Sequence, residues 1–177
     1  LTDIRMRVED ADGLKRLLFR RFVRVAENAE AARMAGDRPT LRQRILVAIG
    51  QALVYAPLRD QVGLRRIRYA YSGGAALGPE TLRFYRGIGV NLKQVYGITE
   101  AGGLVCVQPD HEIRADSVGT PLPGTEVAFT ETGEILLRSP AIFGGYYRNS
   151  EATEQALVDG WLHTGDAGFS APDGHLV

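Results

Sequence analysis

The chain has 177 residues, of which 45% are hydrophobic and 24% are charged, and its formal net charge is zero. This composition is typical of a soluble globular protein, and the length is sufficient for one domain with its own core. A neutral chain has no electrostatic basis for binding nucleic acid, and no apolar run approaches the roughly 20 residues needed to span a bilayer.

The single cysteine and the three histidines do not indicate a catalytic or metal site. Cys106 cannot form an intrachain disulfide, which favours a reducing compartment, and its apolar neighbours predict a small buried side chain rather than a nucleophile. The residues His111, His163 and His175 have no metal-ligand spacing, so we expect each to be solvated or to cap a backbone group.

Two helices are predicted near the start of the chain. Apolar residues recur at helical spacing over residues 12–35, and Gly36 is a natural end for that helix. A second helix is expected to begin at Thr40 and to run to Tyr55, because Pro57 should end it. Arginines crowd this region, and they form either a solvated face with ion pairs or a surface for anionic membrane lipid.

The pattern then changes to strand, helix and strand. Residues 67–71 and 90–95 are predicted to be strands, and Pro79 is a favourable first residue for a short helix that runs to about residue 86. This order, with glycines at the strand ends, predicts a parallel α/β unit.

The remainder of the chain is β-rich. Residues 126–130 and 134–138 predict a hairpin, and the Asp-Gly pairs at 159–160 and 173–174 predict two further turns. Ser150 is a candidate N-cap for a short helix whose first turn is acidic.

The first candidate motif is Tyr96-Gly97-Ile98-Thr99-Glu100, which follows a predicted strand. Ligands of open α/β sheets gather beyond the carboxyl ends of strands, where an aromatic ring can stack on a base. Gly97 allows close approach of a ligand to the backbone, Thr99 offers a hydroxyl to a phosphate, and Glu100 is an oxygen ligand of the kind that Mg²⁺ prefers. Taken alone, the pentapeptide fits a turn with a surface glutamate equally well.

Two further motifs complete the candidate site. Gly73 and Gly74 follow the neighbouring strand, where they fit either a ligand or a tight turn. Asp166 comes directly after a glycine in residues 161–166, and a carboxylate in that setting can accept hydrogen bonds from the two hydroxyls of a ribose.

In this order and spacing, the three motifs resemble the AMP-binding, adenylate-forming superfamily, which includes acyl-CoA synthetases, luciferases and the adenylation domains of peptide synthetases. The resemblance covers nearly all of residues 65–177. The linking segments fit as well: Ser117-Val118-Gly119-Thr120-Pro121-Leu122-Pro123-Gly124, Gly133-Glu134-Ile135-Leu136-Leu137-Arg138 and Gly144-Gly145-Tyr146-Tyr147.

The resemblance implies a role towards ATP for each motif. Thr99 would meet the phosphates, Glu100 would hold Mg²⁺, and these two residues would act in catalysis. Asp166 would bind the ribose. The nucleotide would also contact a strip beside the acyl pocket and a wall around the adenine, formed by Gly73, Gly74, Ala75, Gln94, Val95, Tyr96, Gly97 and Ile98.

The expected architecture is an interior piece of a larger α/β, AMP-binding domain. Residues 1–64 would be an arginine-rich helical insert, residues 65–117 an α/β unit for nucleotide and acyl group, and residues 118–177 a β-rich section with the ribose-binding aspartate. The family also has a lysine-containing phosphate loop and a small C-terminal domain with a catalytic lysine. Neither is matched here, since Lys15 and Lys93 stand in other contexts.

The helical insert resembles long-chain acyl-CoA synthetases, which implies a long-chain fatty acid–CoA ligase that forms AMP. Its substrates would be ATP, a fatty acid and coenzyme A, with Mg²⁺ as cofactor. The expected location is cytoplasmic, with peripheral membrane contact through the arginine-rich helices, and the piece alone should be inactive. The alternatives are a ligase for another carboxylic acid or a carrier protein, and a non-catalytic nucleotide-binding fragment.

Overall fold

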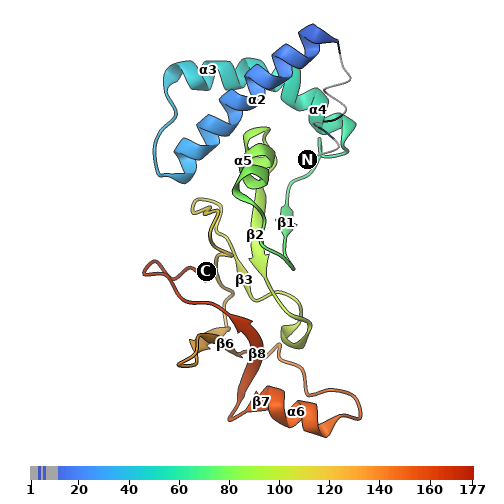
Figure 1. Ribbon diagram of the computed structural model, residues 1–177, viewed down its shortest axis with the longest axis vertical. Coiled ribbons are helices and arrows are strands. Elements are labelled where there is room, and N and C mark those ends of the chain that lie inside the picture. The colour runs from blue at the N-terminus through green and yellow to red at the C-terminus, as the bar shows by residue number, and fades with distance from the viewer. Residues whose placement is uncertain (1–3, 5, 7–11) are drawn as a thin grey trace. The chain divides into compact units, whose positions relative to one another are not determined.

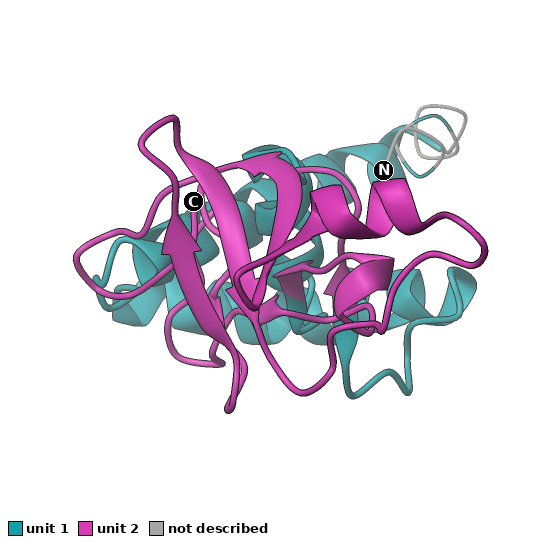
Figure 2. Cartoon of the chain, turned by 90° about the horizontal axis from the view of Figure 1, so that it is seen from below, with its two compact units in different colours: residues 1–70, 77–92 teal, residues 71–76, 93–177 magenta. Residues whose placement is uncertain are grey.

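The computed structural model describes residues 4, 6 and 12–177, and the chain forms two compact units (Figure 2). Unit 1 comprises Leu1–Ala70 and Leu77–Leu92, and unit 2 comprises Tyr71–Ala76 and Lys93–Val177. In the described part of the chain, no helix is both long enough and apolar enough to cross a membrane.

Unit 1 is helical (Figure 1). The predicted first helix is confirmed as α2 (Gly13–Met34), and Gly36 follows it with φ of 81°, a conformation that favours glycine. The next helix, α3 (Leu41–Gly50), begins as predicted after Thr40. Thr40 and Gln43 form a capping box, in which each side chain accepts from the backbone N–H of the other residue.

The prediction that Pro57 ends this helix is wrong. The backbone continues through a π-helical turn, η1 (Gln51–Tyr55), into α4 (Ala56–Gln61), so Pro57 lies in the first turn of α4. Pro57 has no N–H to donate to the preceding turn, and the π-helical turn, which interrupts the regular α-helical bonding, lies directly before α4.

The core of unit 1 joins these helices to α5 (Pro79–Gly87), the short helix predicted from Pro79. Tyr55 is fully buried, and its hydroxyl donates to the carbonyl oxygen of Phe22 at 2.7 Å. The buried carboxylate of Glu30 is balanced by the guanidinium groups of Arg86 at 2.6 Å and Arg33 at 3.0 Å. The described part of the unit is therefore held by an apolar interior into which these ion pairs are set.

The first sheet has the order β1-β2-β3-β4, with β1 (Ala70–Ser72), β2 (Leu92–Tyr96), β3 (Cys106–Val107) and β4 (Thr120–Pro121). The predicted order of strand, helix and strand is confirmed as β1, α5 and β2. The pairings of β2 with β3 and of β3 with β4 are antiparallel. The parallel direction of β1 and β2 stays a prediction, and β1 is shorter than the strand predicted at 67–71.

The second sheet, wholly in unit 2, is antiparallel with the order β5-β6-β8-β7. Its strands are β5 (Glu126–Phe129), β6 (Glu134–Arg138), β7 (Leu157–Val158) and β8 (Trp161–Ala167). The hairpin of β5 and β6 and the turn at 159–160 are confirmed. The last predicted turn, at 173–174, is also confirmed, because the backbone N–H of Ala171 donates to the carbonyl oxygen of His175.

The remaining short elements of unit 2 are a 3-10 turn, η2 (Thr99–Ala101), and a helix, α6 (Ser150–Ala156). The predicted cap of α6 is wrong by one residue. Asn149 is the N-cap, and its side-chain oxygen accepts from the backbone N–H of Ala152 at 3.1 Å, while Ser150 is the first helical residue. Asparagine is as good a cap as serine, so the sequence alone does not choose between them.

Candidate functional site

A cavity of about 420 Å³ lies within unit 2, where the ends of strands from both sheets meet. Two stretches that are distant in the sequence line it, residues 74–76 after β1 and residues 94–98 along and after β2, and they are joined there by Asp166 near the end of β8. The structure thus brings together members of all three motifs. Gly73, Thr99 and Glu100 are not among the described residues that line it.

Tyr96 and Asp166 are joined directly at this cavity. The hydroxyl of Tyr96 donates to Oδ2 of Asp166 at 2.7 Å, although the two residues are 70 positions apart. The pKa of Tyr96 is raised above its ordinary value, chiefly by burial and further by the hydrogen bond to Asp166. The phenol therefore stays protonated at neutral pH and remains a donor, while Asp166 is exposed and keeps further acceptor positions.

The glycines of the motifs serve different purposes. A Cβ at Gly97 would lie 2.0 Å from the carbonyl oxygen of Gly103, and a Cβ at Gly73 would lie 2.9 Å from Cγ2 of Val95. Contacts within the chain are thus sufficient to require glycine at both positions, and the predicted approach of a nucleotide to them stays a prediction. Gly74 has φ of +84°, and a Cβ at this position would have no atom within 4 Å, so it leaves open space beside the cavity.

Glu100 is held by a tyrosine of its own. Its Oε1 accepts from the hydroxyl of Tyr146 at 2.8 Å, and its carbonyl oxygen accepts from the backbone N–H of Phe143 at 2.8 Å. The carboxylate raises the pKa of Tyr146, and the ring of Tyr146 meets that of Phe143 edge-on at 4.8 Å. The sequence did not predict a role for Tyr146, because its partner Glu100 lies 46 residues away in the chain.

The donor set around Glu100 is compatible with magnesium bound together with phosphate. The described residues contain no group of three or more histidines, cysteines, aspartates or glutamates that could hold a metal ion by themselves. Mg²⁺ is commonly bound through one or two carboxylates plus substrate phosphates, so a single partly exposed carboxylate fits such an ion.

A buried polar network adjoins the cavity lining. The Gln94 amide is enclosed and donates to the carbonyl oxygens of Ala115 and Ser117, both at 3.0 Å, and the Gln94 backbone N–H donates to Oε1 of Gln108 at 3.0 Å. Gln94 thus fixes the strand against a neighbouring loop, and its predicted contact with a nucleotide stays a prediction. A polar residue in an apolar strand signals a buried partner, but not which one.

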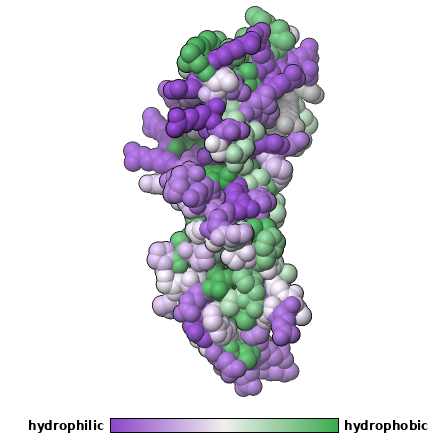
Figure 3. All heavy atoms as spheres, turned by 90° about the vertical axis from the view of Figure 1, so that its left-hand side faces the viewer, coloured by the Kyte–Doolittle hydropathy of each residue, from purple (hydrophilic) through white to green (hydrophobic). Residues whose placement is uncertain are grey.

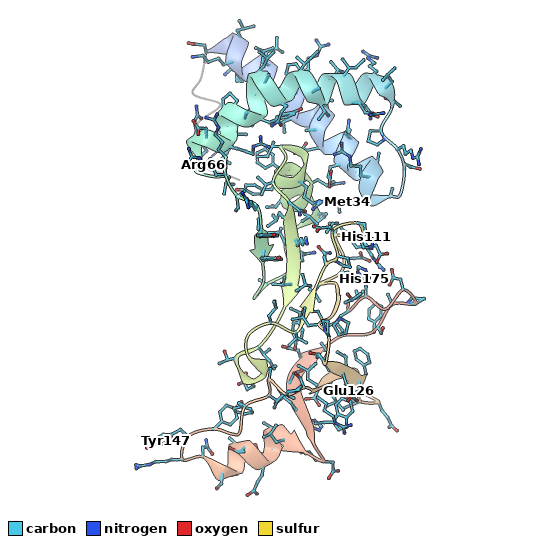
Figure 4. All side chains as sticks on the ribbon, turned by 180° about the vertical axis from the view of Figure 1, so that it is seen from behind. Met34, Arg66, His111, Glu126, Tyr147 and His175 are labelled. Carbon is cyan, nitrogen blue, oxygen red and sulfur yellow. The ribbon has the colours of Figure 1, made fainter. Side chains whose placement is uncertain are left out.

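The prediction for the histidines is wrong for His175. This residue, labelled in Figure 4, is 1% exposed. Its Nδ1 lies 2.8 Å from Oγ of Ser117. His111 is exposed, as expected for a solvated residue. Cys106 is fully buried, and burial raises the pKa of its thiol to about 12, which agrees with the predicted packing role.

The family of AMP-binding enzymes matches residues 18–147, and the chain belongs to this family. Over 158 residues it is 39% identical to the long-chain-fatty-acid–CoA ligase FadD15 of Mycobacterium bovis. That similarity covers 88% of this chain but 26% of the relative, so the chain spans about a quarter of the relative's length.

Solved structures agree with this assignment. The amide bond synthetase McbA of Marinactinospora thermotolerans is 33% identical with a TM-score of 0.59, over 71% of this chain and 29% of that one. The anthranilate CoA ligase AuaEII, solved in complex with anthranoyl-AMP, is 28% identical with a TM-score of 0.59, over 72% of this chain and 27% of that one. The predicted fold, a part of an adenylate-forming enzyme, is confirmed.

Proposed function

We propose that this chain is part of an AMP-forming ligase that activates a long-chain fatty acid with ATP and passes it to coenzyme A. The observation that carries the proposal is the cavity of unit 2, where Tyr96 and Asp166 are hydrogen-bonded beside the strip that begins at Gly74. The similarity to a long-chain-fatty-acid–CoA ligase supports the choice of acid and acceptor.

Five residues at or near the cavity have a task in this proposal: Gly74, Ala75, Tyr96, Thr99 and Asp166. The Tyr96 ring would stack on the adenine, and Asp166 would accept hydrogen bonds from the ribose hydroxyls with the positions that Tyr96 leaves open. Gly74 and Ala75 would lie between the adenine and the acyl group. The hydroxyl of Thr99 would donate to a phosphate oxygen.

The reaction has two steps. An oxygen of the fatty carboxylate attacks the α-phosphorus of ATP, the bond to pyrophosphate breaks, and an acyl-adenylate forms. The sulfur of coenzyme A then attacks the acyl carbon, and AMP leaves. Glu100, with phosphate oxygens, would hold Mg²⁺, which when bound offsets the negative charge that builds on the phosphates.

Glu100→Gln in the intact ligase, the full-length protein in which this chain would lie, tests the assignment. The variant keeps the shape of the side chain and its acceptor for Tyr146, but removes the charge. Fatty-acid-dependent exchange of pyrophosphate into ATP should fall on the order of a hundredfold, because a metal ligand at a charge-bearing transition state supplies several kcal/mol. Thioester formation from acyl-AMP supplied directly should change much less, because pyrophosphate has already left.

Glu131→Gln, at the exposed turn between β5 and β6, is the matched control and should leave both half-reactions intact. Equal losses in the two half-reactions, together with a lower melting temperature, would contradict the metal assignment. Exchange driven by short or aromatic acids but not by fatty acids would favour a ligase for another carboxylic acid. The 177-residue chain alone should show no ligase activity, because its sequence has no match to the phosphate loop or catalytic lysine of the family.

The proposal includes a cytoplasmic enzyme that touches the membrane through unit 1. The large apolar side chains Leu41, Ile45 and Ile49 recur every four residues along α3 and are 70%, 51% and 44% exposed. Hydrophilic side chains lie among hydrophobic ones on this helical unit (Figure 3). Sedimentation of the protein with vesicles that contain anionic lipid, but not with neutral vesicles, would support this contact. Sedimentation of the protein to the same extent without any vesicles would contradict it.

A further inference from the structure

The strand end that carries Asp166 is held by a side chain from the neighbouring strand. Glu134, the first residue of β6, receives two hydrogen-bonding groups from β8. Its Oε1 accepts from the backbone N–H of Gly165 at 3.0 Å, and its Oε2 lies 3.1 Å from Nδ1 of His163. Both carboxylate oxygens therefore contact the short stretch before Asp166, through His163 and Gly165.

Such a clamp is needed because the regular pairing of the strands is interrupted at this place. The register of β6 and β8 shifts between Glu134 and Leu136. Gly165 has φ of +73°, a conformation that favours glycine, and it lies between His163 and Ala167, which pair with β6. Glycine can adopt more backbone conformations than other residues, so a bond that holds Gly165 also fixes the direction of the next side chain.

A second side chain acts on the same bend. The hydroxyl of Thr164 donates to the carbonyl oxygen of Ile135 at 2.8 Å and accepts from the backbone N–H of Asp166 at 3.1 Å. The backbone N–H groups on both sides of the bend are thus satisfied by side chains. The pKa of Glu134 is lowered, first by the Gly165 backbone N–H and then by His163, so the carboxylate is ionised at neutral pH and accepts on both oxygens.

We propose that Glu134 is a positioning residue, which fixes the bend at Gly165 and thereby aims the carboxylate of Asp166 at the cavity and at the hydroxyl of Tyr96. This inference rests on the proposed function, because it needs Asp166 to bind the ribose. Glu134 itself does not line the cavity, although the next residue, Ile135, does. Its effect on the nucleotide is therefore transmitted through Asp166.

The test compares ATP with 2′-deoxy-ATP and 3′-deoxy-ATP in pyrophosphate exchange by the intact ligase. The wild type should prefer ATP by about tenfold or more in kcat/KM, because a deoxynucleotide leaves a charged acceptor without a donor. Glu134→Ala should lower kcat/KM for ATP towards the deoxynucleotide value, so that the preference shrinks to within about threefold. A residue needed only for stability would lower the three values together and leave the preference unchanged.

Two conservative variants of Glu134 separate the effect of side-chain length from the effect of side-chain charge. Glu134→Gln keeps an acceptor at the same distance from the Gly165 N–H and should retain most of the preference for ATP. Glu134→Asp keeps the charge but is one methylene shorter, so it should lose the preference, and it decides the matter where Glu134→Ala does not fold. Glu126→Ala, on β5 with an exposed side chain 3.7 Å from Arg138, is the matched control and should retain the wild-type preference.

The outcomes distinguish this inference from the proposed function. A wild type that does not discriminate ATP from either deoxynucleotide would contradict the ribose role of Asp166, and the inference would fall with it. A wild type that discriminates, together with folded Glu134→Ala and Glu134→Asp variants that discriminate equally well, would overturn the role of Glu134 alone. Loss of the preference in Glu134→Asp with its retention in Glu134→Gln is the expected result.

Discussion

In unit 1 the helices enclose large apolar side chains such as Phe84 and Ile88, and the ion pair of Glu30 and Arg86 is set among them. The interior of unit 2 has an apolar cluster of similar kind, which includes Cys106 of the first sheet and Leu137 and Leu162 of the second. Unit 2 differs because it also encloses uncharged polar side chains that bond to backbone groups or to one another: Gln94, Gln108, Ser117 and His175.

This difference matters for the site. Apolar contacts are non-directional and can be satisfied by several arrangements, whereas a buried hydrogen bond is lost when the two groups move apart. Gln94 lies in β2 two residues before Tyr96, so its bonds to Ala115 and Ser117 restrict the strand that presents the tyrosine. Directional bonds from enclosed amide, hydroxyl and imidazole side chains therefore hold the backbone beside the candidate site in unit 2.

The largest loss of stability is expected from a Gly→Ala substitution in unit 2, and a Gly→Ala substitution in unit 1 should cost less. In unit 2, Gly119→Ala would place a Cβ 2.1 Å from the carbonyl carbon of Val107 at φ of +95°, and we expect a loss of stability of about 3 kcal/mol or more. In unit 1, Gly87→Ala would place a Cβ 3.0 Å from the carbonyl carbon of Ala26. Because alanine favours the helix by about 1 kcal/mol, this change should cost less.

Urea unfolding of the 177-residue chain, followed by circular dichroism and by the fluorescence of Trp161, measures both variants. A loss in Gly87→Ala that equals or exceeds the loss in Gly119→Ala would break the comparison, because unit 1 would then be the more tightly constrained of the two.

The hydroxyl groups of Tyr55 in unit 1 and Tyr96 in unit 2 should differ in what they contribute, with effects of intermediate size. Tyr55→Phe would remove a buried hydrogen bond to the carbonyl oxygen of Phe22, and we expect a loss of about 0.5–1.5 kcal/mol in stability with no change in nucleotide affinity. Tyr96→Phe should barely change stability, because water can replace the phenol at the exposed Asp166. Nucleotide affinity of the intact ligase should instead fall about fivefold, since the carboxylate loses one holding bond.

Melting curves and nucleotide titrations of both variants separate these outcomes. Equal effects of the two substitutions on stability, with nucleotide affinity untouched in both, would mean that the Tyr96 hydroxyl is as purely structural as that of Tyr55.

The smallest expected effect is electrostatic and depends on pH. Arg114 pairs with Asp116 at 2.8 Å and with Asp173 at 2.6 Å, at the surface of unit 2. The Arg114 guanidinium lowers the pKa of Asp116, and the His175 backbone N–H followed by Arg114 lowers that of Asp173. Because both values are lowered, the stabilisation is present above the ordinary aspartate pKa of about 3.9 and is lost as the pH falls through the lowered values.

Arg114→Gln should therefore lower the melting temperature slightly at pH 7 and approach the wild type as the pH falls below about 4. Arg65→Gln, which removes the exposed pair with Asp60 at 3.6 Å in unit 1, is the control. A difference between Arg114→Gln and wild type that grows on acidification would contradict the assigned sign.

Local patterns made much of the fold predictable from the sequence. The apolar spacing of α2, the capping residue Thr40 and the turn pairs at 159–160 and 173–174 are all features of neighbouring residues, and they indicated the right elements. The exceptions at Pro57 and Ser150 concern the exact course of a helix, where two neighbouring solutions differ little in energy.

The sequence predicted which motifs form the candidate site, but not which of their residues are hydrogen-bonded to one another. The three motifs were recognisable because each is a short stretch of chain, and parts of all three line the same cavity. The partnership of Ser117 with His175 joins residues 58 positions apart, and that of Tyr96 with Asp166 joins residues 70 positions apart. Such pairs depend on how the sheets are assembled, which no spacing within one motif contains.

The most direct test of the account is a crystal structure of the intact ligase with a non-hydrolysable acyl-adenylate analogue. We expect the adenine against the ring of Tyr96, the ribose hydroxyls bonded to Asp166, and the Gly165 N–H still bonded to Glu134. A nucleotide bound away from this cavity, or a ribose that makes no contact with Asp166, would contradict the central claim that unit 2 carries the nucleotide site.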